Sequence, residues 1–175
     1  MKFSLDHAVE ILSQTPVTLR LLLSGLSAPW INNNEGAQTW GPFDVVGHLI
    51  HGERTDWMPR LKIILEHGET RPFTPFDRFA QFEASRGKSL PELLNTFAAL
   101  RRENLITLQQ LHLTPEDFNL KGTHPDFGVV TLEQLLATWV VHDLDHLGQI
   151  ARVLAKQYKA EVGPWINYLS ILTSR

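Results

Sequence analysis

Residues 131–150 read TLEQLLATWVVHDLDHLGQI, and this stretch carries the strongest helix signals in the chain. Thr131, followed three residues later by Gln134, forms the capping-box pattern that begins many helices. Apolar residues then recur at helical spacing along one stripe. The stripe comprises Leu132, Leu135, Leu136, Trp139, Leu147, Ile150, Val153 and Leu154. We therefore predict a long amphipathic helix from Thr131 to about Lys159, with one buried face.

Two histidines, His142 and His146, lie four residues apart on this helix, so their side chains share one face. Helical spacing places both toward one edge of the apolar stripe. Two imidazoles in this arrangement can bind one metal ion, with nitrogen–metal distances of about 2.0–2.1 Å. Histidine pairs at this spacing also occur without metal, as hydrogen-bonded core residues. The segment is His-Asp-Leu-Asp-His rather than His-Glu-x-x-His, which disfavours a zincin protease.

Three further helices are predicted from the same periodicity and from cap signals. Pro16 lies inside the first helix and should kink or interrupt it. Pro42 fits the first turn of the second helix, and Pro59 should bend it. Ser89 and Glu92 form a second capping box. The predicted helices span residues 5–26, 42–66 and 89–111.

The connections between these helices are long and rich in proline and glycine. The connection at residues 68–88 also holds Phe73, Phe76, Phe79 and Phe82, which indicates a segment packed on the helices and partly helical. A short apolar segment, Trp165 to Leu172, closes the chain, and no strand pattern competes. The sequence predicts an all-α single domain over residues 1–175, a four-helix bundle with long crossover loops and a short C-terminal helix.

A third metal ligand is expected from the second helix, because catalytic ions usually take three protein ligands and keep one open position. This helix offers His48 and His51, both at the margin of its apolar face, and geometry does not choose between them. Glu53 projects onto that face, and Asp143 projects nearer the centre of the stripe on the long helix. Either acid is a candidate for orienting a metal ligand, or a hydrogen-bonded structural acid.

The composition excludes several classes of protein. The chain has no cysteine, which removes disulfides, thiolate metal sites and a cysteine nucleophile. Its formal net charge is −3 and it has no basic block, so no nucleic-acid partner is expected. The apolar runs are too short to span a bilayer, and the first residues lack the apolar core of a signal peptide, so no membrane partner and a cytoplasmic location are expected.

Three motifs together resemble the DinB-like superfamily of helical-bundle metalloproteins, also called the DinB/YfiT-like putative metalloenzymes. They are WGPFDVVGHL at residues 40–49, the His-x-x-x-His stretch within residues 135–150, and THPDFGVVTL at residues 123–132. The resemblance covers nearly the whole chain. It implies that His48, His142 and His146 are the metal ligands, and so favours His48 over His51. It also implies a bundle with long crossovers that is often a homodimer, and zinc or nickel as the divalent metal ion.

Two functions are open at this point. Relatives in such a family include hydrolases, isomerases and transferases of low-molecular-weight thiols, so the first is a metal-dependent enzyme in which a metal-activated water or thiol attacks a small-molecule substrate. Aromatic residues in the loops would shape its pocket: Trp30, Trp40, Phe76 and Phe127. The second is a non-enzymatic, stress-related binding or dimerising module whose metal is structural or adventitious. The sequence identifies no catalytic base and no substrate.

Overall fold

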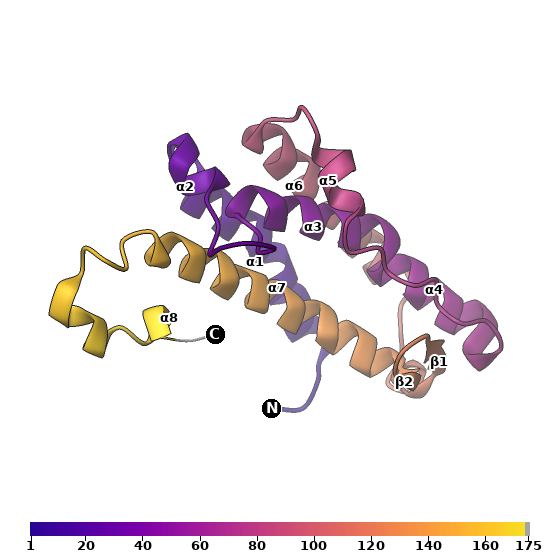
Figure 1. Ribbon diagram of the computed structural model, residues 1–175. Helices are drawn as coiled ribbons and strands as arrows, with labels where there is room; N and C mark the ends of the chain where they lie inside the picture. The colour runs from indigo at the N-terminus through magenta and orange to yellow at the C-terminus, as the bar shows by residue number, and fades with distance from the viewer. Residues whose placement is uncertain (174–175) are drawn as a thin grey trace.

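A computed structural model describes residues 1–173 and has four long helices packed as a bundle (Figure 1). Both α1 (Leu5–Leu23) and α3 (Pro42–Thr55) contact α6 (Leu90–Gln110) and α7 (Leu132–Lys156). The order around the bundle is therefore α1, α6, α3 and α7. Since α1 and α3 lie diagonally across from one another, the chain between them is a crossover. The predicted all-α four-helix bundle with crossover connections is confirmed.

Helix starts follow the capping signals of the sequence. At α7 the Gln134 amide N–H donates to Thr131 Oγ1 at 3.1 Å, and the Thr131 N–H donates to Gln134 Oε1 at 2.9 Å. At α6 the Ser89 N–H donates to the Glu92 carboxylate at 2.7 Å. These bonds satisfy N–H groups that have no partner within the helix. The two boxes thus begin the helices where the sequence predicts.

Pro16 does not interrupt α1, which runs continuously from Leu5 to Leu23. A proline lacks the N–H that would bond the carbonyl four residues earlier, here that of Leu12. A buried arginine supplies the missing donor, since Arg101 Nη1 lies 2.8 Å from Leu12 O. The expected interruption was wrong because a tertiary hydrogen bond satisfies the carbonyl. The helix also ends earlier than predicted, before Gly25, which has a φ of +82°.

The second predicted helix is two helices, α3 and α4 (Trp57–His67), that meet at Asp56. The bend therefore falls three residues before Pro59, which lies in the first turn of α4. Proline is tolerated in a first turn, where its missing N–H costs nothing. The predicted bend is present, but it begins at Asp56.

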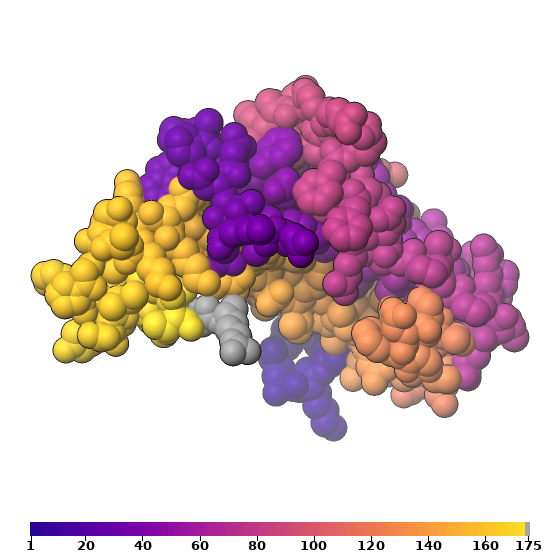
Figure 2. Space-filling view, viewed as in Figure 1, coloured from indigo at the N-terminus to yellow at the C-terminus, as the bar shows by residue number. Residues whose placement is uncertain are grey.

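Short helices fill the crossovers. The chain between α1 and α3 contains α2 (Ala28–Asn32), and the chain between α4 and α6 contains a 3-10 turn (Gly68–Thr70) and α5 (Ala80–Ser85). Figure 2 shows these two crossovers side by side on one face of the molecule. The prediction that residues 68–88 pack on the bundle and are partly helical is confirmed, since α5 contacts α3.

A small β-hairpin was not predicted. Strand β1 (Lys121–His124) pairs antiparallel with β2 (Gly128–Thr131), and Lys121 lies opposite Thr131. Each strand has only four residues, too few for an alternating pattern to stand out. Gly128 has a φ of +72°, which glycine adopts without strain in such a turn. The hairpin lies at the end of the bundle where α7 begins (Figure 1).

The core has two apolar clusters separated by a polar layer. One cluster surrounds Trp57 and Trp139, and the other surrounds Phe97 and Ile150. Between them along the helices lie buried charged side chains and histidines. These are His48, Glu53, Arg101, Asp143 and His146. Buried polar groups are expensive unless paired, so this layer is where a functional site is expected.

The chain after α7 forms a 3-10 helix (Gly163–Tyr168) and α8 (Ser170–Thr173), so the predicted short C-terminal helix is present. This segment folds back beside the end of α7 (Figure 1). Over residues 1–173, no helix is both long and apolar enough to cross a membrane.

Candidate metal centre

Three histidines from two helices meet in the polar layer. His48 comes from α3, and His142 and His146 come from successive turns of α7. The Nε2 atom of His142 lies 3.1 Å from Nε2 of His48 and 3.1 Å from Nε2 of His146. Each residue offers a ligand atom within 4.8 Å of the others, and this is the group of potential metal ligands found among residues 1–173. The structure thus brings together the three histidines that the sequence singled out.

His51 does not join this group. Its ring packs against Phe76, with ring centroids 4.8 Å apart, and its Nε2 lies 3.4 Å from Thr55 Oγ1. One turn of α3 separates the two histidines, so only His48 faces α7. Packing of α3 on α7 makes the choice that helical spacing alone left open.

The protonation of the three rings favours a cation between them. Gln149 Oε1 is an acceptor 2.8 Å from His146 Nδ1, so His146 carries its proton on Nδ1 and presents a lone pair on Nε2. Burial lowers the pKa of His48 to about 3 and that of His142 to about 2, and repulsion from the protonated form of His146 adds to both shifts. Burial also lowers the pKa of His146. All three imidazoles are therefore neutral near pH 7, the state that binds metal.

The Nδ1 atoms of His48 and His142 are buried and have no hydrogen-bond partner among the described residues. When Nε2 binds a metal, Nδ1 carries the proton and usually donates it to an oxygen. Here only His146 has such a partner, Gln149. The donor set of three neutral imidazoles fits a divalent metal ion, and it does not discriminate sharply among zinc, nickel, cobalt and copper.

Aromatic side chains surround the three rings. Trp40 packs on His48 with ring centroids 4.8 Å apart, Phe76 lies 5.4 Å from His48, and Trp57 lies 5.0 Å from His142. His48 is 7% exposed and His146 is 8% exposed, whereas His142 is half-buried. The surroundings of the site are thus apolar and largely dry.

Arg101 links the two acids near the site. Its Nη1 donates to Asp143 Oδ2 at 2.6 Å, and its Nη2 donates to Asp143 Oδ1 at 3.0 Å and to Glu53 Oε1 at 2.8 Å. Trp139 Nε1 also donates to Glu53 Oε1, and Asn104 Nδ2 donates to Glu53 Oε2. Burial acts to lower the pKa of Arg101, but the bonds and charges of Asp143 and then Glu53 outweigh it and raise the pKa.

The two acids are therefore structural partners of Arg101. Neither Glu53 nor Asp143 accepts a hydrogen bond from the three imidazoles in the described part of the chain. Sequence reasoning missed both Arg101 and the role of Gln149. The spacing of Phe97, Arg101 and Leu105, four residues apart each time, places the arginine on the buried face of α6.

Two of the four aromatic residues predicted to shape a pocket lie elsewhere. Trp40 and Phe76 contact His48, as expected. Trp30 instead packs against Tyr158, with centroids 4.9 Å apart. Phe127 stacks on His124 in the hairpin and is 77% exposed. Those two predictions were wrong because the position of a loop residue depends on the path of its loop. The spacing of residues along the sequence does not predict that path.

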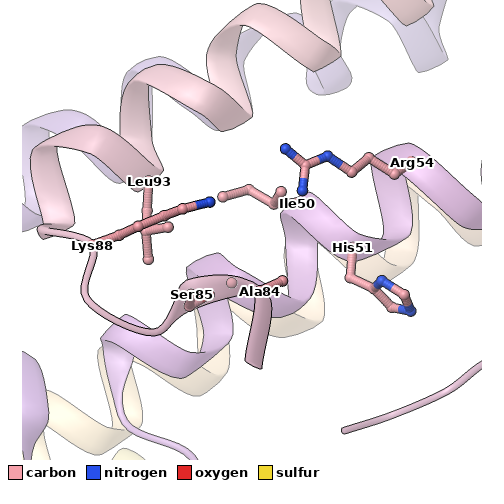
Figure 3. Close-up of a pocket in the computed structure, with 8 residues that line it drawn as sticks. Ile50, His51, Arg54, Ala84, Ser85, Lys88 and Leu93 are labelled. Atoms are coloured by element: carbon pink, nitrogen blue, oxygen red, sulfur yellow. The ribbon is translucent and has the colours of Figure 1, made fainter. Parts of the chain in front are cut away.

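A small cavity lies near His51, beside α3, α5 and the start of α6 (Figure 3). Its volume is about 10 Å³, room for about one water molecule. Figure 3 shows the side chains of Arg54 and Lys88 extending toward one another from opposite sides. The three clustered histidines do not line it, so it is separate from the metal centre.

The protein is thus a four-helix bundle in which two helices, α3 and α7, bring three neutral imidazoles together. These features define a class of bundle proteins with a histidine site in the core. The family model for the DinB superfamily matches residues 11–150, so the chain belongs to the DinB superfamily. The resemblance seen in the sequence motifs is confirmed.

The fold also matches a solved structure, described as YfiT from Bacillus subtilis, a probable metal-dependent hydrolase with an unusual four-helix bundle topology. The two sequences are 22% identical, the TM-score is 0.76, and the match covers 90% of this chain and 91% of that chain. At this identity the likeness concerns the fold. The comparison with curated proteins gives no match.

Proposed function

We propose that this protein is a metal-dependent hydrolase that acts on a small molecule, with His48, His142 and His146 as the metal ligands. The observation that carries the proposal is the convergence of three neutral imidazole Nε2 atoms, 3.1 Å apart in two of the pairs. Lone pairs so close repel one another unless a proton or a cation lies between them. The description of YfiT as a probable metal-dependent hydrolase supports the same class of reaction.

Zinc or nickel is the expected ion. Three protein ligands leave a position open for water, and a divalent ion bound here would lower the pKa of that water enough to supply hydroxide near neutral pH. Gln149 holds the ring of His146 in the tautomer that binds metal. Trp40, Trp57 and Phe76 keep bulk water from the imidazoles. In such a dry site electrostatic stabilisation is stronger than in water.

The first experiment measures metal content in protein purified without a metal-affinity tag. We expect about one ion per chain, the number that one three-ligand site holds. The ion should be lost from the His142→Ala, His146→Ala double variant. The matched control is His51→Ala, which removes a neighbouring histidine outside the cluster and should keep the ion. A parent protein that takes up no ion, even after incubation with zinc or nickel, would contradict the proposal.

The second experiment assigns the reaction. Metal-loaded and metal-free protein are assayed against esters, amides and lactones of small acids, with and without a low-molecular-weight thiol. Hydrolysis that needs the ion and not the thiol supports the hydrolase. Consumption of the thiol that requires the ion would instead indicate a thiol transferase that uses the same bound ion. A loss of thermal stability in the histidine variants with no reaction in any assay would favour a structural metal. The homodimer expected from the sequence stays a prediction.

A further inference from the structure

One exposed arginine of the crossover beside the metal centre, Arg78, has no ion-pair partner among the described residues. Arg78 lies in the crossover between Phe76, which packs on His48, and Phe82, which packs on Trp40 with ring centroids 6.4 Å apart. Trp40 in turn contacts the rings of His48 and His146. The contacts on both sides of Arg78 therefore hold this part of the crossover at the rim of the three-histidine site.

Arg78 follows Phe76 closely in the chain, and the ring centroids of Phe76 and His48 are 5.4 Å apart. Arg78 is exposed, and no hydrogen bond or ion pair joins it to any other residue among 1–173. A guanidinium is always charged near neutral pH and presents donors suited to carboxylate, sulfonate or phosphate oxygens.

None of the acidic side chains nearby pairs with Arg78 in the described part of the chain. Asp77 accepts a hydrogen bond from the Phe79 N–H at 2.9 Å, and its charge acts on His51. Glu83 pairs with Arg86. Asp145 acts on His146 from the α7 side of the site. The carboxylates of the crossover thus leave Arg78 available to an outside anion.

The same rim exposes aromatic surface. Phe79 is 70% exposed and stacks on Phe82, which is 42% exposed, with ring centroids 6.4 Å apart. From Phe79 the contacts run through Phe82 and Trp40 to His48. Aromatic rings beside a charged donor are the usual make-up of a small-molecule site, where apolar walls give affinity and a few polar groups give orientation.

We propose that Arg78 determines substrate specificity by binding an anionic group of a small molecule whose apolar part packs on Phe79 and Phe82. The substrate of the proposed hydrolase, on which this inference rests, is then a small organic anion with an apolar or aromatic body. Its reactive group would lie toward the three histidines and its anionic group at Arg78.

Two fluorescent probes test the anion site without requiring the reaction. 8-Anilinonaphthalene-1-sulfonate carries a sulfonate, and N-phenyl-1-naphthylamine has the same rings without it. Both are titrated into the protein as purified and after metal removal. In the parent, the sulfonate probe should bind more tightly than the neutral probe, and added salt should reduce that difference.

The Arg78→Gln variant should lose about five- to tenfold in affinity for the sulfonate probe, and its affinity for the neutral probe should stay within about twofold. Arg86→Gln, which makes the same charge change in the same crossover, is the control and should bind both probes as the parent does. Phe79→Ala should weaken both probes, which locates them at this rim.

The proposal is overturned if Arg78→Gln binds the sulfonate probe as tightly as the parent, or if Arg78→Gln and Arg86→Gln weaken it equally. Equal loss would show a general effect of net charge. Because the probes are also tested on metal-free protein, this failure is distinct from that of the hydrolase proposal, which appears as the absence of a bound ion.

Discussion

At the scale of single residues, the environment of each histidine decides what it can do. His48 and His142 have low pKa values because burial removes the water that would stabilise their charged forms. His51 lies one turn from His48 on the same helix and is more exposed. Two histidines of one short helix thus differ in chemistry, and the difference comes from the neighbouring helix rather than from α3 itself.

These low pKa values predict how the stability of the metal-free protein depends on pH. In the unfolded chain both histidines titrate near about pH 6.5. Below that pH the unfolded state binds more protons than the folded state, so the free energy of unfolding falls as the pH falls from about 6.5 to about 3. Each histidine contributes a slope of up to about 1.4 kcal/mol per pH unit. Urea unfolding of metal-stripped protein at several pH values across this window measures the slope.

The comparison that isolates the histidines uses His48→Gln, which cannot titrate in this range. Carboxylates also titrate at low pH, and they contribute equally to parent and variant. The variant should therefore show a shallower slope between about pH 6.5 and about pH 4. Parallel slopes in the two proteins would mean that His48 is not held neutral in the folded state.

At the scale of elements, close approach of the hairpin to α4 depends on a glycine. Gly122 of β1 is buried against Ile64 and Phe73. A Cβ atom added there would lie 2.7 Å from Ile64 Cγ1 and 2.9 Å from Phe73 Cε1 and Cζ. Both side chains belong to the core cluster around Trp57, so neither can move away without disturbing it.

We expect Gly122→Ala to lower the free energy of unfolding by about 1–3 kcal/mol, because overpacking a core forces side chains from their preferred conformations. Gly148→Ala is the matched control. Gly148 lies within α7, and apart from its chain neighbours and the backbone of its own helix, no described heavy atom lies within 4 Å of an added Cβ. That change should stabilise the protein by about 0.5–1 kcal/mol, because alanine is the better helix former. Urea unfolding distinguishes the two signs, and equal effects would argue against the close approach.

At the scale of the whole molecule, one guanidinium connects all four helices of the bundle. Arg101 comes from α6 and bonds Leu12 O of α1, Glu53 of α3 and Asp143 of α7. The two helices that carry the histidines are thereby tied together close to the metal centre. The arginine also packs over the rings of Phe97 and Trp139, at 4.9 and 5.1 Å from their centroids.

We expect Arg101→Met to destabilise the protein by about 3–5 kcal/mol, because it leaves two carboxylates buried without a counter-charge. Thermal and urea unfolding measure the loss. Adding Glu53→Gln and Asp143→Asn to this variant removes the stranded charges and should recover part of it. The control is Arg86→Gln, which breaks the exposed pair with Glu83 and should change stability by less than about 1 kcal/mol. An Arg101→Met variant as stable as the control would contradict this account.

The sequence by itself determined the features that depend on neighbours along the chain. The long helix around His142 and His146, its capping box and the stacking of those two histidines follow from a rise and periodicity shared by all α-helices. The bend of the second helix and the helical part of the crossover also carried local signals, from proline, glycine and aromatic spacing. Family motifs then pointed to His48.

Only the tertiary structure decided what depends on residues distant in sequence. His48 and His142 are 94 positions apart, and their meeting depends on how α3 packs on α7. The carbonyl freed by Pro16 is satisfied by an arginine 89 positions away from Leu12. The paths of the crossovers brought Phe76 to the site and left Phe127 outside it. Local propensity does not predict such contacts. They form only when the buried faces of different elements pack together and each buried polar group acquires a hydrogen-bond partner.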